Sequence, residues 1–317
     1  MAEKRPLKIV LVAEESAGVQ VLRALHGAPE APEIVAIVST TAPEHGRRPL
    51  VAAAVEQLGL VMRSAAELQR PSFSSWLRER EVDVLLNVHS LVVLDADIIA
   101  APRLGSFNLH PGPLPEYAGL NAPSWAIYRD EPRHGVTLHW MDSGVDSGPI
   151  AYESSFDIDE GDTGLSLTAK CVRHGVPLTL RLLADATRDP SSVPARAQDL
   201  RKRNYFGREV PNGGRIVWST SAREIVRFVR AADYMPFTSP WGLPRAEVSG
   251  HTVGVAKASL TGECSEQRAG TVRAPEGSGA MRVAARDEWV AVQRLWLDGR
   301  YVKPADLCWT GNYLEVR

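Results

Sequence analysis

Two polar side chains, at positions 108 and 110, have the types and the spacing needed to act on one ligand. The segment 105–110 reads Gly-Ser-Phe-Asn-Leu-His. In an extended segment, side chains two residues apart point to the same side, so the Asn108 amide and the His110 imidazole converge. Prolines 111, 113 and 115 then end the strand, because each fixes its own φ and lacks a backbone N–H. These residues alone fit a plain strand end with a proline-rich turn more often than a site.

A third candidate is Asp146, in a loop that follows a strand predicted over 135–140. The loop reads Met-Asp-Ser-Gly-Val-Asp-Ser-Gly from residue 141 to residue 148. Two glycines in so short a stretch indicate a tight turn that carries Asp146 to a defined place. Asp142 and Asp146 taken singly are also common turn residues, and that interpretation stays open.

The elements around these residues alternate in type. Apolar, β-branched runs predict strands, and helical spacing of apolar residues predicts helices between them. Such alternation is typical of a doubly wound α/β sheet, whose ligand sites lie beyond the carboxyl ends of the strands. The strands are expected at 8–13, 34–38 and 82–87, and the helices at 16–25, where Ser16 would be the cap, 50–58 and 65–80.

The loop after the first strand, Glu14-Glu15-Ser16, should therefore face the site. There is no GxGxxG and no GxxxxGK[ST], so neither a dinucleotide nor a P-loop site is indicated. Paired carboxylates would repel phosphate and favour a cationic substrate. The competing interpretation is a favourable interaction of these carboxylates with a helix N-terminus.

The second part of the chain has a different pattern. Helices are predicted from Thr163 to Gly175 and over 176–184, and a linker rich in Pro and Ser follows. Ser221 and Glu224 match a capping box at the start of another helix. Short alternating segments from residue 246 to residue 297 then favour a small β-barrel. We predict domains at 1–188 and 206–317, joined by a linker at 189–205.

Composition narrows the class of protein. The 317 residues carry a formal net charge of -2, and three cysteines without a CxxC suit a reducing compartment. No apolar run approaches the roughly 20 residues that span a bilayer, and no signal peptide is recognised, so a cytoplasmic location is expected. From residue 201 onward 18 Lys/Arg oppose 12 Asp/Glu, against 18 and 26 before it. This asymmetry hints at a polyanion footprint, but no array of Lys/Arg with interleaved aromatics accompanies it.

Together these motifs resemble the family of 10-formyltetrahydrofolate-dependent formyltransferases. The resemblance rests on 108–115 (Asn-Leu-His-Pro-Gly-Pro-Leu-Pro), on Gly135-Val-Thr and on Asp146-Ser-Gly-Pro-Ile, in this order. It continues from residue 214 as a resemblance to the OB-like C-terminal domain of the methionyl-tRNA formyltransferase branch. The resemblance implies a Rossmann-like formyltransferase domain followed by a smaller OB-like β-barrel domain.

The resemblance also implies roles for the three polar residues. Asn108 and a protonated His110 would donate hydrogen bonds to the formyl oxygen as negative charge develops on it. Asp146 would orient His110 and accept a proton from the attacking amine, directly or through water. The co-substrate would be 10-formyltetrahydrofolate, and no metal is expected, since the histidines form no recognisable ligand set.

The family's pteridine cleft corresponds by position to two segments. They are Leu91, Val92, Val93 and Leu94, and Met141, Asp142, Ser143 and Val145. Apolar side chains beside backbone donors and acceptors suit a flat heterocycle, although residues 91–94 taken one by one also fit an ordinary core. Acceptor-binding candidates are Glu14, Glu15, Ser16, Pro111, Gly112 and Tyr117.

The acceptor is the open question. Domain layout and length resemble the tRNA-formylating branch, and transfer to initiator Met-tRNA is therefore the alternative function. The acidic Glu14-Glu15 turn and the short loop 44–48 depart from that branch, because a tRNA stem needs phosphate neutralisation. We therefore expect a small-molecule amine, free or bound to a carrier: an amino sugar, an ornithine-type amine or an aminoacyl group. A catalytically silent folate-binding protein, and transfer of a related one-carbon group, are further alternatives.

Overall fold

The chain folds into two compact units. In the computed structural model, residues 5–40, 49–276 and 279–315 are described, so the loop at 44–48 lies outside the described residues. The first unit comprises residues 1–120, 134–156 and 169–206, and the second comprises 121–133, 157–168 and 207–317. Each unit is described by itself below.

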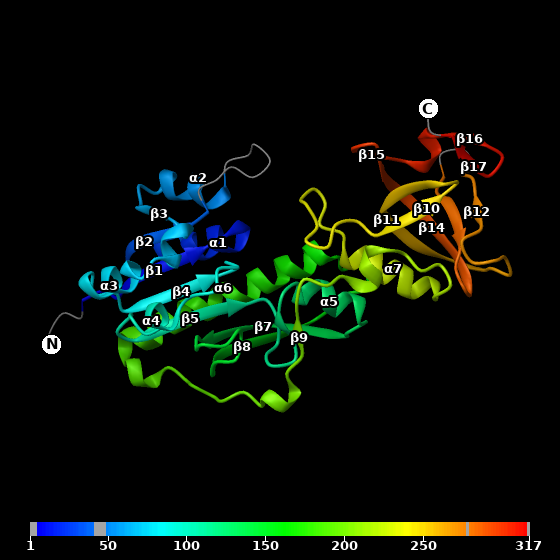
Figure 1. Ribbon diagram of the computed structural model, residues 1–317. Helices are drawn as coiled ribbons and strands as arrows, with labels where there is room; N and C mark the ends of the chain where they lie inside the picture. Colours follow the sequence, from blue (N-terminus) through cyan, green and yellow to red (C-terminus); the bar gives the residue numbers. More distant parts are fainter. Residues whose placement is uncertain (1–4, 41–48, 277–278, 316–317) are drawn as a thin grey trace. The chain divides into compact units, whose positions relative to one another are not determined.

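The first unit is built on a seven-stranded sheet with the order β3-β2-β1-β4-β5-β7-β8 (Figure 1). Strands β1 to β5 run parallel to their neighbours, whereas β7 is antiparallel to β5. This confirms the predicted Rossmann-like α/β class. The bounds are β1 (Lys8–Ala13), β2 (Glu33–Ser39), β3 (Met62–Ser64), β4 (Val84–Val88), β5 (Gly105–His110), β7 (Arg133–Trp140) and β8 (Ile150–Asp157).

The central strands are buried because helices flank a parallel sheet. Every residue of β4 is buried, and so are five of the six residues of β1, which explains their continuous apolar sequences. The helices and 3₁₀ turns of this part are α1 (Glu15–His26), α2 (Leu50–Gln57), η1 (Ala65–Gln69), α3 (Ser72–Glu79) and α4 (Ala96–Ile99).

Helix α1 begins two residues earlier than a Ser16 cap would allow. Its N-cap is Glu14, without a side-chain cap bond, and Ser16 is exposed within the helix. Gly18 permits this abrupt start, since a Cβ there would lie 2.7 Å from the Cβ of Ala13. The predicted Ser16 cap was therefore wrong, because close packing of α1 on the end of β1 sets the start.

Two further helix predictions need correction. Residues 65–80 form η1 and α3 rather than one helix, and Pro71 stands as the N-cap between them. The two helices predicted over 163–175 and 176–184 are replaced by the single helix α6 (Gly164–Arg188), with Pro177 inside it. Gly175 does not end α6. It permits close packing instead, because a Cβ there would lie 2.9 Å from Leu109 Cδ2.

After α6 the chain stays in the first unit as far as Phe206. It forms the 3₁₀ turns η2 (Pro190–Ser192) and η3 (Leu200–Lys202) and the short strand β9 (Tyr205–Phe206). Strand β9 pairs in parallel with β6 (Ala118–Gly119), which lies in the loop that follows β5. The segment predicted as a linker is therefore held along the loops of the first unit.

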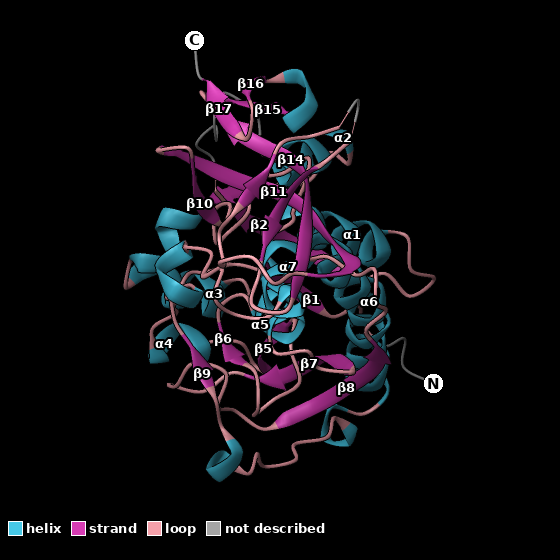
Figure 2. Ribbon diagram, turned by 90° about the vertical axis from the view of Figure 1, so that its right-hand side faces the viewer, coloured by secondary structure: helices cyan, strands magenta, loops and turns pink. Residues whose placement is uncertain are grey.

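The second unit contains an antiparallel, nearly closed barrel, as predicted (Figure 2). Its order is β10-β11-β14-β13-β12, with β15 paired to β14. Helix α7 (Ala222–Ala231) opens with the predicted capping box: Ser221 accepts from the Glu224 backbone N–H, and Glu224 accepts from that of Ser221. The strands are β10 (Arg245–Val248), β11 (His251–Cys264), β12 (Val272–Arg273), β13 (Met281–Ala284), β14 (Glu288–Leu297) and β15 (Arg300–Val302).

An aromatic cluster joins α7 to a helix from the middle of the chain. Trp125 and Tyr128 belong to α5 (Ala122–Tyr128), and their rings lie 4.9 Å from Trp241 and 5.7 Å from Phe228 respectively. The remaining elements are η4 (Pro211–Gly214), η5 (Pro304–Asp306), β16 (Cys308–Thr310) and β17 (Tyr313–Glu315). In the described part of the chain, no helix combines the length and apolar character needed to cross a membrane.

The capping box gives a test of the second unit. Replacing Ser221 by Ala removes the acceptor for the Glu224 N–H, and loss of such a cap costs about 1 kcal/mol. We expect the free energy of unfolding of the transition that includes α7 to fall by about this amount in denaturant titrations. Ser219→Ala, at an exposed turn residue three positions before α7, is the matched control and should change it little. Equal effects of the two substitutions would contradict the assignment.

Candidate active site

A row of three polar residues crosses the sheet at the end of β5. In the strand registers Asn87 of β4 faces Asn108 of β5, and Asn108 faces His139 of β7. Residues paired in this way project to the same face of a sheet. His110 lies two residues beyond Asn108 on β5, so its side chain shares that face, as the i, i+2 spacing predicted.

The row fixes the orientation of the Asn108 amide. Asn87 Nδ2 donates to Asn108 Oδ1 at 3.0 Å. Asn108 Nδ2 therefore turns the other way, toward His139 Nε2 at 3.1 Å and Asp146 Oδ1 at 3.1 Å. His139 Nδ1 donates to the Trp140 carbonyl oxygen at 2.7 Å, and its Nε2 faces both Asn108 Nδ2 and Asp146 Oδ1.

Asp146 reaches this row through a constrained loop. Its backbone has φ of 54°, in the left-handed region that is uncommon for residues other than glycine. Gly148 is required in the same loop, because a Cβ there would lie 1.9 Å from the Trp140 carbonyl oxygen. The two glycines predicted such a turn, and the structure brings Asn108, His110 and Asp146 together.

Four groups surround the buried Asp146 carboxylate. The Gly119 N–H donates to Oδ2 at 2.8 Å, and Asn108 Nδ2 donates to Oδ1 at 3.1 Å. His110 Nδ1 lies 3.4 Å from Oδ2, and His139 Nε2 lies 3.3 Å from Oδ1. Because the residue is 8% exposed, these partners replace the water that would otherwise solvate its charge.

The surroundings shift the pKa values of both His110 and Asp146. Burial is the largest influence on His110 and lowers its pKa, although the Asp146 carboxylate opposes this. Burial alone would raise the pKa of Asp146, but the charge of His110, the hydrogen bond from His139 and the Gly119 N–H together hold this pKa well below its usual range. Asp146 is therefore the anion of the cluster at neutral pH.

His110 is held on both sides. Its Nε2 lies 2.6 Å from the Tyr117 carbonyl oxygen, to which it donates, and its Nδ1 faces Asp146. A half-buried amide, a buried imidazole and an anionic carboxylate within hydrogen-bond reach of one another can donate to a developing oxyanion and accept a proton.

The apolar candidates at 91–94 divide into two kinds. Leu91 and Val93, two residues apart in one loop, are 80% and 70% exposed, although both side chains are large and apolar. Leu94 is buried in a core cluster, and Val92 packs against the same cluster. The loop that carries Asp146 shows the same division: Val145 is 41% exposed, whereas Met141 packs against the core.

Asp142 and Ser143 differ in their surroundings. Asp142 Oδ1 accepts from the Gly144 N–H at 3.0 Å and from Ser147 Oγ at 2.7 Å, so its carboxylate closes the turn before Asp146. Ser143 is exposed.

The two acidic residues after β1 also have different partners. The Glu14 carboxylate accepts from the backbone N–H and the hydroxyl of Thr40, at 2.7 and 2.8 Å, and from Ser39 Oγ at 3.1 Å. Glu15 Oε2 lies 4.0 Å from His89 Nδ1, and this contact lowers the pKa of Glu15. Glu14 thus links the end of β1 to the end of β2 by hydrogen bonds. The Glu15 carboxylate is exposed and can be reached by a ligand.

The loop that follows His110 uses its backbone carbonyls internally. His134 Nε2 donates to the Pro111 carbonyl at 3.0 Å, and Thr137 Oγ1 donates to the Gly112 carbonyl at 2.8 Å. Tyr117 is 6% exposed, and its ring stacks on Phe206 at 5.3 Å between centroids. These contacts give the loop its shape, and the Tyr117 carbonyl in turn orients His110.

Sequence reasoning missed Asn87 and His139. Asn87 is the single polar residue of β4, which is otherwise apolar, and this signal could have drawn attention to it. His139 shares its strand with other polar residues, Thr137 among them, and does not stand out in this way. Their role depends on the strand register, and a register between strands distant in the sequence cannot be read from either strand alone.

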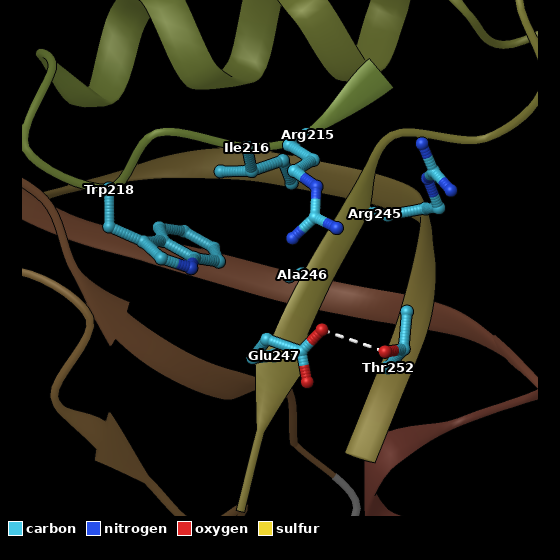
Figure 3. A pocket seen from close by; sticks show the side chains of 7 residues that line it. All are labelled: Arg215, Ile216, Trp218, Arg245, Ala246, Glu247 and Thr252. Atoms are coloured by element: carbon cyan, nitrogen blue, oxygen red, sulfur yellow. Dashed lines mark hydrogen bonds between the residues drawn. The ribbon is translucent and has the colours of Figure 1, made fainter. Parts of the chain in front are cut away.

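A pocket of about 190 Å³ lies in the second unit (Figure 3). Arg215, Trp218, Arg245 and Glu247 are among its lining residues, and Glu247 accepts from Thr252 Oγ1 at 2.7 Å. Guanidinium and carboxylate groups in one pocket give it no single charge preference. Within the described residues, no group of three His, Cys, Asp or Glu side chains is arranged to hold a metal ion.

Comparisons with known proteins match both parts of the chain to described families. A family model described as "Formyl transferase" matches residues 7–181, more than half of the chain, and one described as "Formyl transferase, C-terminal domain" matches residues 210–312. The bifunctional polymyxin resistance protein ArnA of Wigglesworthia glossinidia brevipalpis is 31% identical over 166 residues, or 52% of this chain. The chain spans about a quarter of that relative, since the match covers 24% of it.

Solved structures share the fold at low sequence identity. An N-formyltransferase from Helicobacter canadensis, in complex with folinic acid and dTDP-3-aminofucose, has a TM-score of 0.69 and 17% identity, covering 90% of this chain and 98% of that one. WlaRD, described as a sugar 3N-formyl transferase, has a TM-score of 0.67 and 19% identity, covering 90% of this chain and 96% of its own.

The buried His134 predicts a pH-dependent stability. Burial lowers the pKa of His134 to about 4, so between pH 6.5 and about 4 the unfolded chain binds a proton that the folded chain does not. The stabilisation is complete above pH 6.5 and is lost as the pH falls to about 4, a loss of about 3 kcal/mol.

Denaturant titrations across this pH range measure the effect. His134→Gln keeps a donor for Pro111 but cannot take up the proton, so its unfolding free energy should fall less steeply with acidification than that of the wild type. His26→Gln, at an exposed position on α1, is the control and should follow the wild type. A His134→Gln curve parallel to the wild type would refute the assignment.

Proposed function

The chain belongs to the formyl transferase family, and we propose that it transfers the formyl group of 10-formyltetrahydrofolate to an amine of a small molecule. The observation that carries the proposal is the cluster of Asn108, His110 and Asp146 at the carboxyl end of β5, in which His110 and Asp146 are buried. Each of the three has a part in the proposed acyl transfer to nitrogen.

In the proposed reaction a neutral amine attacks the formyl carbon. A new C–N bond forms, the bond from carbon to N10 of the folate breaks, and the amine loses one proton while N10 gains one. Negative charge develops on the formyl oxygen in between, and donors aimed at that oxygen contribute a few kcal/mol. Asn108 Nδ2 is such a donor, because Asn87 keeps its carbonyl end turned away.

Asp146 is suited to receive the amine proton. Its low pKa keeps it anionic at neutral pH, and its carboxylate touches His110, so a proton taken up there can be shared with the imidazole. His110 can donate to the formyl oxygen only by giving up a present partner. The weaker of its two contacts is the one to Asp146, at 3.4 Å against 2.6 Å to Tyr117.

We assign the folate to the surface presented by the loops at 91–94 and 141–145. Leu91, Val93 and Val145 expose large apolar side chains there, as a site for a flat heterocycle requires. The Helicobacter canadensis structure contains folinic acid, and WlaRD was crystallised with 5-N-formyl-tetrahydrofolate, which supports a folate in this fold. Leu94, Val92 and Met141 would support this surface from the core.

For the acceptor we favour an amino sugar over ornithine-type or carrier-bound amines. The Helicobacter canadensis structure contains dTDP-3-aminofucose, and WlaRD is described as a sugar 3N-formyl transferase. The exposed Glu15 carboxylate, beside His89 at the carboxyl ends of β1 and β4, can attract an ammonium group before it is deprotonated for attack. Initiator Met-tRNA remains the alternative acceptor.

The first test is formyl transfer from 10-formyltetrahydrofolate to a panel of amines, with the formylated product detected by mass spectrometry. The panel contains nucleotide-linked amino sugars, ornithine derivatives and initiator Met-tRNA. Asn108→Ala should lower kcat by about 10²- to 10³-fold, the usual effect of removing an oxyanion donor. If only the tRNA is formylated, the proposal of a small-molecule acceptor is wrong. If Asn108→Ala leaves the transfer rate unchanged, the proposed site is wrong.

Glu15 gives a test of acceptor charge. Glu15→Gln should raise the acceptor KM about two- to fivefold, because an exposed ion pair contributes below about 1 kcal/mol, and it should leave the folate KM unchanged. Glu14→Gln is the comparison: it should lower stability through the lost bonds to Thr40 without the same rise in KM. An acceptor KM unchanged in both variants would rule out a cationic acceptor at this turn.

A further inference from the structure

An extended segment that follows α6 runs back across the active-site loops. This segment, residues 194–206, is called the strap here. Its Pro194 carbonyl accepts from Trp140 Nε1 at 2.7 Å, and Arg196 forms a two-bond bridge with Ile150, at 2.8 and 3.0 Å. Farther along, Ala118 N–H donates to the Asn204 carbonyl, and Leu120 N–H donates to the Phe206 carbonyl. The strap is therefore fixed at both ends to strands and loops of the first unit.

Between these anchors, side chains of the strap hold the loop that carries Asp146. Gln198 Nε2 donates to the carbonyl oxygens of Asp146 and Gly148, at 3.1 and 2.6 Å. Arg203 Nη2 donates to the Val145 carbonyl at 2.8 Å. Three of the four carbonyls from 145 to 148 are thus bound by a segment about fifty residues away in the sequence.

The orientation of the Gln198 amide follows from its neighbours. Both contacts are to carbonyl oxygens, so the nitrogen and not the oxygen must face them. Gln198 Oε1 is buried and has no hydrogen-bond partner among the described residues. Burying an unpaired oxygen is unfavourable in free energy, and the two hydrogen bonds that Nε2 donates to the Asp146 loop offset this cost.

These contacts matter because the Asp146 backbone is strained. A non-glycine residue with φ of 54° costs on the order of 1 kcal/mol and persists only where its surroundings hold it. The bond from Gln198 reaches the carbonyl of the strained residue itself. Without it, the loop can relax and carry the carboxylate away from Asn108 and His110.

We propose that Gln198 is a positioning residue that holds Asp146 in its working geometry. The assignment rests on the proposed function for its kinetic consequence, but its structural consequence can be measured without any substrate. Gln198 does not touch the Asp146 carboxylate, so it acts through the backbone of the loop.

The test uses Gln198→Met, which keeps the length and apolar volume of the side chain and removes both donors. Arg196→Met is the matched control: it lies on the same strap, and its side chain pairs with Glu153 at the surface, away from the Asp146 loop. Circular dichroism and the unfolding midpoint confirm that both variants are folded.

The first readout is hydrogen exchange of three adjacent backbone amides. Gly119 N–H bonds to the Asp146 carboxylate, whereas Ala118 and Leu120 N–H bond to the strap backbone. In Gln198→Met the Gly119 amide should exchange at least tenfold faster, while its two neighbours stay protected. Unchanged exchange at Gly119, or equal acceleration at all three amides, would overturn the proposal.

The second readout is steady-state formyl transfer. Gln198→Met should lower kcat at least tenfold with less than a threefold change in the KM of the formyl donor, and Arg196→Met should behave as the wild type. If the wild type transfers no formyl group, the proposed function fails and the amide exchange still decides the role of Gln198. Faster Gly119 exchange with an unchanged kcat would overturn the catalytic importance of this positioning.

Discussion

The buried charge of Asp146 is the interaction on which the rest of the site depends. An isolated carboxylate removed from water would cost several kcal/mol. Here the Gly119 N–H, the Asn108 amide and two imidazoles surround it. Asn108 and His110 come from β5, His139 from β7 and Gly119 from the loop after β5, so the site forms only when β5, β7 and the two loops are all in place. The same contacts that stabilise the anion also orient the groups that the proposed transfer uses.

Three of the strained non-glycine residues lie in the loops around the site. Glu15, His89 and Asp146 all have φ between 54° and 56°. Glu15 and His89 follow the carboxyl ends of the parallel strands β1 and β4, where a Rossmann-like sheet places its ligand, and Asp146 lies in the loop between β7 and β8. Such conformations persist where surrounding contacts hold them. The Asp146 loop shows what those contacts are: a glycine that admits the Trp140 carbonyl, and carbonyls bound by Gln198 and Arg203.

The exposed and buried apolar residues near the site have separate tasks. Leu94, Val92 and Met141 belong to or pack against a core cluster, which fixes the loops that carry them. Leu91 and Val93 stand out from the same loop into solvent. Apolar exposure of this kind is costly in water unless a ligand covers it, and a folate with its flat ring system suits that surface.

The sequence by itself determined the local features. Alternation of apolar runs predicted the parallel sheet, the Ser221–Glu224 pair predicted a helix start, and the i, i+2 spacing of Asn108 and His110 placed them on one face. These depend on neighbours within a few residues. The tertiary structure alone decided the rest. Gly175 packs against Leu109 instead of ending α6, and the Glu14 carboxylate accepts hydrogen bonds from Thr40. The structure also brings three further side chains to the site: Asn87, His139 and Gln198. The partners of Asn87, Glu14, Gln198 and Gly175 are 21 to 66 residues away in the chain, and strand register and loop packing, which no local pattern specifies, bring them together.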